Sequence, residues 1–167
     1  PTEADVGKQS TMLTTVLAKK PDAIGFAALD SKAASQLMNQ AKAANIPVIG
    51  FDSGVESDVP VTTAATDNKA AAAEAAKHLS ALLGGKGSVA LVIHDQTSQT
   101  GIDRRAGFVT AAKANAQGIT LRDPPYTNSD LAKADDLTHA PHAHPAILHR
   151  HQSPTHTPPA GAQQGGP

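Results

Sequence analysis

Three aspartates stand at the ends of short apolar segments of the sequence: Asp30, Asp52 and Asp95. If those segments are parallel strands, their carboxyl ends share one edge of a sheet and the three carboxylates converge on one crevice. Ionised carboxylates in such a crevice accept hydrogen bonds from a polar ligand. Aspartate is also a common turn residue and helix N-cap, so each of the three taken alone favours a structural role.

Arg104 lies near the start of a predicted helix that runs through Phe108. An arginine in this place opposes the helix dipole, because cations are favoured at the C-terminal end of a helix. Another interaction should therefore favour it. Bidentate hydrogen bonds to ligand hydroxyls or to a carboxylate would do so. A salt bridge to Asp103, Asp67 or Asp95 would do so equally well.

The sequence lacks the motifs of common catalytic and cofactor sites. The glycine-rich segment 84–88 lies between a helix and a strand, whereas a phosphate loop follows a strand and opens a helix. Gly-x-Gly-x-x-Gly follows no predicted strand, and Gly-x-Ser-x-Gly is absent. His94 and Asp95 are expected to point apart, so His94 is interpreted as a loop histidine. We expect no catalytic residue, no metal site and no cofactor.

The elements that must position these residues alternate between helices and strands. The predicted helices are 2–19, 31–44, 67–83, one through 108–112 and one from 128, and the predicted strands are 22–29, 46–51, 61–65, 88–93 and 118–121. This order demands parallel strands with right-handed crossovers. We therefore predict an α/β fold with one doubly wound sheet of four or five parallel strands and helices on both faces. Asp30, Asp52 and Asp95 should lie at one edge of it, with Arg104 within reach.

Composition excludes several classes of function. A formal net charge of −1 does not provide the excess of positive charge that binds nucleic acid. The lack of cysteine excludes disulfides and thiolate zinc sites. No apolar run approaches the length of about 18–20 residues that spans a bilayer, so we expect no membrane insertion. Residues 139–167 hold six of the eight histidines and six of the twelve prolines. This tail is poor in apolar residues and is predicted to be disordered.

Four segments occur together in a familiar order: Pro21-Asp22-Ala23-Ile24, Ile46-Pro47-Val48-Ile49-Gly50-Phe51-Asp52-Ser53, Thr66-Asp67-Asn68 and Arg104-Arg105-Ala106-Gly107-Phe108. As a set they resemble the ribose/galactose-type periplasmic sugar-binding proteins of ABC importers, which are relatives of the LacI-type repressor cores. The resemblance covers residues 1 to about 138. It implies two Rossmann-like lobes joined by three crossovers, with a monosaccharide or polyol bound between them and no catalysis. It also implies a periplasmic location, although this chain shows no signal peptide, and importer membrane subunits as partners.

The resemblance also implies roles for single residues. Asp52 matches an aspartate that accepts sugar hydroxyl protons, and Arg104 matches an arginine that donates to ring and hydroxyl oxygens. Ser53 stands where the ribose-binding member has arginine, so the resemblance does not imply ribose as the ligand. Asn128 falls near a second-lobe position that is often aromatic. The pair 67–68 matches a Ser/Thr-Asp-Asn motif, which implies a helix cap and support between the lobes.

The same resemblance divides the chain into three parts. Residues 1–123 form a first lobe without its first strand and helix, residues 124–138 form the crossover and the start of the second lobe, and residues 139–167 form the tail. The tail is interpreted as an out-of-frame extension, a cloning artefact or a native linker. An alternative function is the effector-binding core of a LacI-type transcription regulator. An enzyme on a flavodoxin-like sheet is disfavoured, because no nucleophile–base pair or cofactor loop is found.

Overall fold

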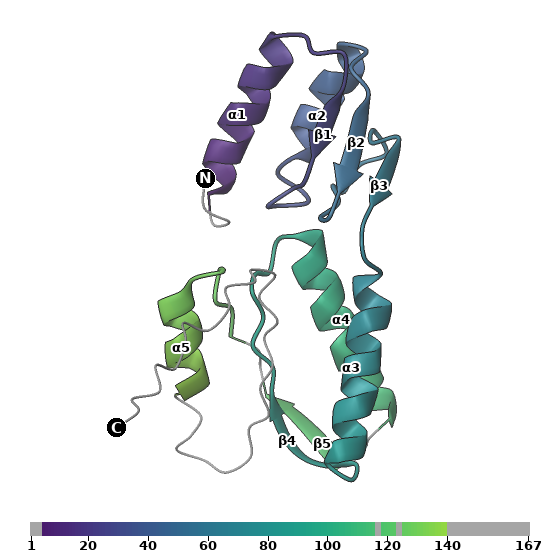
Figure 1. Cartoon of the computed structure of the whole chain (residues 1–167), viewed down its shortest axis with the longest axis vertical. Helices are drawn as coiled ribbons and strands as arrows, with labels where there is room; N and C mark the ends of the chain where they lie inside the picture. Colours follow the sequence, from purple (N-terminus) through teal and green to yellow (C-terminus); the bar gives the residue numbers. More distant parts are fainter. Residues whose placement is uncertain (1–4, 116–117, 123–124, 140–167) are drawn as a thin grey trace, which may run out of the picture.

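Helices and strands largely alternate along the described parts of the chain, and the strand pairings β1-β2, β2-β3 and β4-β5 are all parallel. The computed structural model describes residues 5–115, 118–122 and 125–139. The elements are α1 (Val6–Ala18), β1 (Ile24–Phe26), α2 (Ser35–Ala43), β2 (Val48–Phe51), β3 (Thr62–Ala64), α3 (Asn68–Leu82), β4 (Lys86–Ala90), α4 (Gln99–Asn115), β5 (Gly118–Arg122) and α5 (Leu131–His139) (Figure 1). The predicted parallel α/β class is confirmed. The predicted tail lies outside the described residues except for His139.

The strands form two sheets, so the prediction of one sheet is wrong. The first sheet has the order β1-β2-β3 and the second pairs β4 with β5. After β3 the chain leads directly into α3, which lies beyond the end of the first sheet (Figure 1). Strand β4 therefore starts from the far end of α3 and does not return to the edge of β3. Alternation of strands and helices predicts parallel pairing but does not say which strands become neighbours.

The first unit, α1 to β3, has its own hydrophobic core. Leu13 and Leu17 of α1 pack with Met38 of α2 and Val48 of β2, and the last two are fully buried. Strand β2 alternates buried and exposed residues, so one face of the sheet meets the helices. The other face carries Phe51, half of whose side chain is exposed. Helices therefore cover this sheet on one face.

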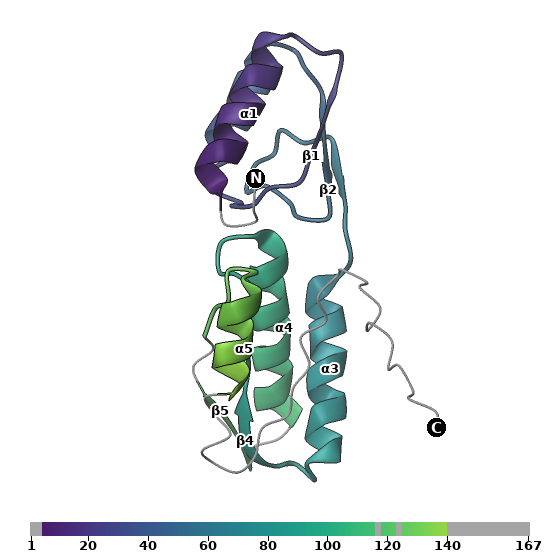
Figure 2. The ribbon, with the colours of Figure 1, turned by 60° about the vertical axis from the view of Figure 1, so that its left-hand side comes forward.

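The second unit, α3 to α5, has a separate core. Ala76 of α3, Val89 of β4 and Phe108 of α4 form its centre. Helices α3 and α4 run side by side (Figures 1 and 2). They approach so closely that a Cβ atom added at Gly107 would lie 2.2 Å from the carbonyl oxygen of Lys69. Small residues on both helices make this approach possible.

Among the residues that the structure describes, no buried residue belongs to both cores. The sheets and cores separate between β3 and α3, at residues 65–67. A first lobe that runs to residue 123 stays a prediction of the resemblance. The division between the two packed units lies much earlier in the chain.

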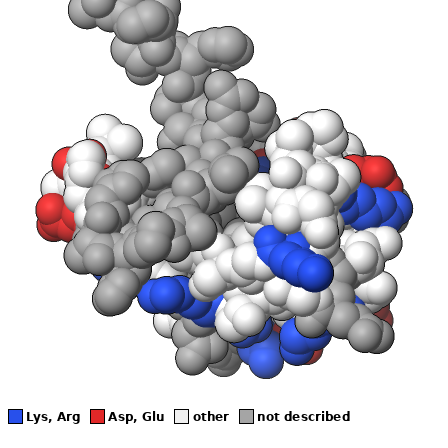
Figure 3. All heavy atoms as spheres, turned by 90° about the horizontal axis from the view of Figure 1, so that it is seen from below, with Lys and Arg blue, Asp and Glu red and all other residues white. Residues whose placement is uncertain are grey.

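On the face shown in Figure 3, Lys and Arg side chains lie at several places with white surface between most of them, and those at the right border Asp or Glu side chains. Ion pairs such as Lys77 Nζ to Glu74 Oε1, at 2.6 Å on α3, join exposed partners. Exposed pairs of this kind contribute little to stability. In the described part of the chain, no helix is both long enough and apolar enough to cross a bilayer.

Candidate functional site

The loops that follow β1, β2 and β4 meet where the two units face each other. The amide of Ser31 donates to the carbonyl of Thr97 at 3.0 Å, and Thr97 Oγ1 donates to the carbonyl of Leu29 at 3.2 Å. The loops after β1 and β2 are joined by the amide of Ala28, which donates to the carbonyl of Ser53 at 3.1 Å. The carboxyl ends of both sheets are therefore neighbours, although they do not form the single sheet edge that we predicted.

Asp30 uses its carboxylate inside its own loop. Its Oδ1 accepts hydrogen bonds from the amides of Lys32 at 2.9 Å and Ala33 at 2.8 Å. These amides belong to the turn that leads into α2, so Asp30 closes the turn in the manner of a cap. The sequence left two roles open for Asp30, ligand binding and a turn or cap, and the geometry favours the turn or cap.

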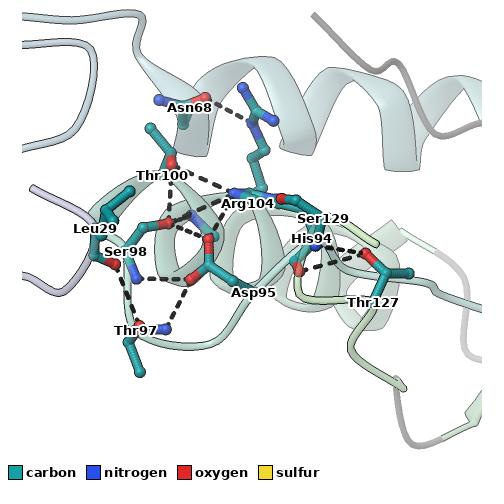
Figure 4. Close-up of polar contacts among 11 residues, drawn as sticks. Leu29, Asn68, His94, Asp95, Thr97, Ser98, Thr100, Arg104, Thr127 and Ser129 are labelled. Atoms are coloured by element: carbon teal, nitrogen blue, oxygen red, sulfur yellow. Dashed lines mark hydrogen bonds and ion pairs between the residues drawn. The ribbon is translucent and has the colours of Figure 1, made fainter. Parts of the chain in front are cut away.

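Asp95 builds the loop between β4 and α4. Its Oδ1 accepts from the amides of Thr97 and Ser98 at 2.8 and 2.7 Å, and its Oδ2 accepts from Ser98 Oγ at 2.6 Å (Figure 4). Burial raises the pKa of Asp95. Hydrogen bonds from His94, Ser98 and Thr97 outweigh that effect and hold the pKa well below its ordinary value. The carboxylate is thus ionised and fully engaged in holding the loop.

His94 contacts Asp95, contrary to the expectation that the two side chains point apart. His94 Nε2 lies 3.0 Å from Asp95 Oδ2. The alternation of a strand does not apply here, because β4 ends at Ala90. Thr127 Oγ1 donates to the carbonyl of His94 at 3.3 Å, and this agrees with the interpretation of His94 as a loop histidine. Among the described residues, no group of three His, Asp or Glu side chains is placed to hold a metal ion.

Arg104 is bound by an amide rather than by a carboxylate. Its Nε donates to Oδ1 of Asn68, the first residue of α3, at 2.9 Å (Figure 4). Asp103, one of the three expected salt-bridge partners, instead lies 3.5 Å from Lys69 Nζ. Within the described parts of the chain, the two Nη atoms of Arg104 make no hydrogen bond or ion pair. Their four N–H groups therefore have no acceptor among the described residues.

Asp52 and Ser53 directly follow β2, and Asp52 has a backbone conformation that few non-glycine residues adopt. Asp52 has φ 58°, in the left-handed region, and its side chain is exposed. Its amide donates to the carbonyl of Ala64 at 2.9 Å. Non-glycine residues in this region often mark functional positions, where the surrounding structure offsets the strain. The neighbouring Ser53 is 6% exposed, and its Oγ has no hydrogen-bond partner among the described residues.

Asn128 lies beside the loop after β4 and is exposed, with φ 53°. The residues on either side of it both bind the carbonyl of His94: Thr127 Oγ1 donates to it at 3.3 Å and the amide of Ser129 donates to it at 3.1 Å (Figure 4). The structure therefore brings Asn128 near the loop of Asp95. No hydrogen bond or ion pair inside the described ranges joins Asp52 to Arg104.

A pocket of about 140 Å³ lies next to this region, between the loop after β4 and the start of α4. Asp95, Ile102, Arg105 and Tyr126 are among the residues that line it. Neither Asp52 nor Arg104 does. The pocket therefore does not coincide with the site that the sequence predicts.

Sequence reasoning missed Asn68 as the partner of Arg104. The two residues are 36 positions apart, so no local pattern links them. The available signal was Gly107 in the segment that follows Arg104. It allows the backbones of α3 and α4 to approach, and this brings Asn68 within reach.

Comparison with known proteins identifies the family. A family model described as "Periplasmic binding protein domain" matches residues 1–143. No curated protein sequence matches the chain. An ABC transporter solute-binding protein from Agrobacterium vitis, solved with D-fucose, is 31% identical with a TM-score of 0.81 over 86% of this chain and 50% of its own. A carbohydrate transporter solute-binding protein from Agrobacterium radiobacter, solved with D-arabinose, is 26% identical with a TM-score of 0.81 over 89% of this chain and 52% of its own.

A second solute-binding protein from Agrobacterium vitis was solved with α-D-tagatopyranose. It is 30% identical, with a TM-score of 0.72 over 78% of this chain and 47% of its own. The chain thus spans about half the length of the solved proteins that it resembles. Both the residues matched by the family model and the parallel α/β fold point to one conclusion. The chain belongs to the periplasmic binding protein domain family.

Proposed function

We propose that this chain is part of a receptor that captures a monosaccharide or polyol for an ABC importer in the periplasm. The solved proteins similar to it hold D-fucose, D-arabinose and α-D-tagatopyranose, which are all neutral polyhydroxyl compounds. One observation carries the proposal: the strand ends of two separately packed units face each other, with Asp52 on one unit and Arg104 on the other. The ligand would bind between these units and leave chemically unchanged.

The two side chains supply the complementary chemistry that a sugar needs. A sugar hydroxyl both donates and accepts, so an exposed carboxylate and a guanidinium with unused N–H groups can bind it together. Hydrogen bonds with one ionised partner are roughly twice as strong as neutral ones. Asp52 would accept from hydroxyls and Arg104 would donate to hydroxyl or ring oxygens. Ser53 and Asn128 would lie at the margins of the same site.

Asp30 and Asp95 take a different part in this proposal. Their carboxylates are engaged by amides of their own loops. They would shape the two loops that meet through Ser31 and Thr97 and would not contact the ligand.

The two units would be the two lobes, with the boundary at residues 65–67. Separate sheets and separate cores support this boundary. It assigns α3, β4, α4 and β5 to the second lobe, whereas the sequence predicted that they belong to the first.

Calorimetric titration of the complete protein with D-fucose, D-arabinose and D-tagatose tests the proposal. Asp52→Asn and Arg104→Ala should each lower the affinity for the bound sugar by about 5- to 150-fold, the usual effect of leaving a buried polar group without its partner. Asp52→Asn should leave the melting temperature unchanged, because asparagine tolerates the left-handed conformation. Asp58→Asn is a matched control, because Asp58 is an exposed aspartate of the same unit. This variant should bind the sugar with the affinity of the wild type. Undiminished binding by both site variants would refute the assignment.

A further inference from the structure

We infer that Asn68 is a positioning residue that orients the Arg104 guanidinium toward the ligand, an inference that rests on the proposed function. Asn68 is 7% exposed, so its amide group is shielded from water. Its Oδ1 accepts from Arg104 Nε at 2.9 Å, and its Nδ2 donates to the carbonyl of Thr66 at 3.1 Å. Both ends of the amide are thus engaged, and the second bond fixes which end faces the arginine.

The helix pair holds the two residues in register. Asn68 begins α3, and Arg104 lies in the second turn of α4. Just after Arg104, Gly107 lets the backbone of α4 approach the backbone of Lys69. Lys69 Nζ in turn lies 3.5 Å from Asp103 Oδ1, which is next to Arg104. The distance between Asn68 and Arg104 is therefore set by the packing of the helices and not by the side chains alone.

Fixing Nε has a specific consequence for the rest of the guanidinium. The group is planar, so one hydrogen bond to Nε from a held acceptor restricts the plane in which both Nη atoms lie. Those Nη atoms make no hydrogen bond or ion pair within the described residues and keep four N–H groups for neighbouring oxygens of a ligand. A side chain that is oriented before binding loses less conformational freedom when the ligand arrives. Asn68 would therefore raise the affinity without touching the sugar.

A purely structural role for Asn68 is the competing explanation, and the neighbouring residue separates the two. Asp67 is the N-cap of α3, and its Oδ1 accepts from the amide of Ala70 at 2.9 Å. The start of the helix is thus capped independently of Asn68. Asp67→Ala removes a cap one residue away and lowers stability, but it leaves the acceptor for Arg104 in place. It is the matched control.

The test is calorimetric titration of the complete protein with D-fucose, D-arabinose and D-tagatose. Asn68→Ala should lower the affinity for the bound sugar about tenfold, because the guanidinium is no longer held. Asn68→Asp keeps an oxygen at the same place and should retain the affinity within about threefold. In an Arg104→Lys background, which has no Nε–H to hold, Asn68→Ala should change the affinity less than about twofold. Asp67→Ala should bind as the wild type does.

The outcomes separate the inference from the function on which it rests. If the wild type binds none of the three sugars, the proposed function fails and the inference fails with it. If the wild type binds and Asn68→Ala binds equally well, the function stands and the inference is overturned. If Asn68→Ala lowers the affinity for the sugar equally in the wild-type and Arg104→Lys backgrounds, the inference is also overturned. It is overturned as well if Asn68→Asp does not retain the affinity of the wild type. If Asn68→Ala does not fold by circular dichroism, Asn68→Ser replaces it, because serine suits a helix start but is too short to reach Nε.

Discussion

Replacing Gly107 with alanine would place a methyl group against the backbone of the neighbouring helix. The new Cβ atom would lie 2.2 Å from the carbonyl oxygen of Lys69 and 2.8 Å from its Cα atom. Ordinary contacts between such atoms are longer, so α4 must move away from α3 by about 1 Å. Because the opposing atoms belong to the backbone of a helix, they cannot rotate out of the way.

Two opposing terms decide the size of the effect. Overpacking a well-packed core costs about 1–3 kcal/mol. Alanine is a better helix former than glycine, which offsets the cost by up to about 1 kcal/mol. We therefore expect Gly107→Ala to lower the free energy of unfolding by about 1–2 kcal/mol. The melting temperature should fall by several degrees.

Urea unfolding followed by circular dichroism measures this loss. Gly7→Ala is the matched control, because Gly7 is also helical but has no atom within 4 Å of the added Cβ. That variant keeps only the gain in helix propensity and should be as stable as the wild type or more stable by up to about 1 kcal/mol. If Gly107→Ala were as stable as Gly7→Ala, the close approach of α3 and α4 would not hold in solution.

Two further predictions concern the loops between the units. The pKa of Asp95 is lower in the folded than in the unfolded protein, so its carboxylate stabilises the fold above its unfolded pKa, and this contribution is lost as the pH falls through the folded pKa. Asp95→Asn should therefore have a lower urea midpoint than the wild type at pH 7, and the difference between the two midpoints should be smaller in strong acid. An equal difference at both pH values would contradict this. Ser53→Ala removes a buried hydroxyl that has no partner among the described residues, so it should raise the free energy of unfolding by up to about 1 kcal/mol. A loss of 1 kcal/mol or more, measured by the same urea titration, would mean that the hydroxyl is hydrogen-bonded.

The class of the fold and most of its elements could be predicted from the sequence. The helix expected over 67–83 is observed at Asn68–Leu82, and the strand expected over 46–51 is observed at Val48–Phe51. Both carry local signals, a capping aspartate in one case and a β-branched apolar run in the other. The arrangement of strands into two sheets carries no such signal. It depends on where α3 leads the chain, which is a property of tertiary packing.

The sequence predicts candidate site residues one by one, but it does not predict the contacts that each of them makes. The sequence left Asp30 and Asp95 open between turn and ligand roles, and only the positions of the amides around them favour the turn role. Arg104 was expected to need a favourable partner, and it has one. That partner is a neutral amide from α3, which is distant in the sequence but packs against α4, whereas the sequence had suggested ligand oxygens or the carboxylate of a nearby aspartate.

The separation of the two hydrophobic cores has a consequence for the local unfolding of the molecule. The residues buried in one core are absent from the other, and the loops between them are joined by a few hydrogen bonds such as Ser31 to Thr97. Cooperativity spreads through shared buried contacts, so each unit should behave as a foldon with its own opening free energy. Native-state amide hydrogen exchange would then give two groups of protection factors, with the change between them at residues 65–67. A single group that runs through this point would mean that the interface couples the two units more strongly than their cores suggest.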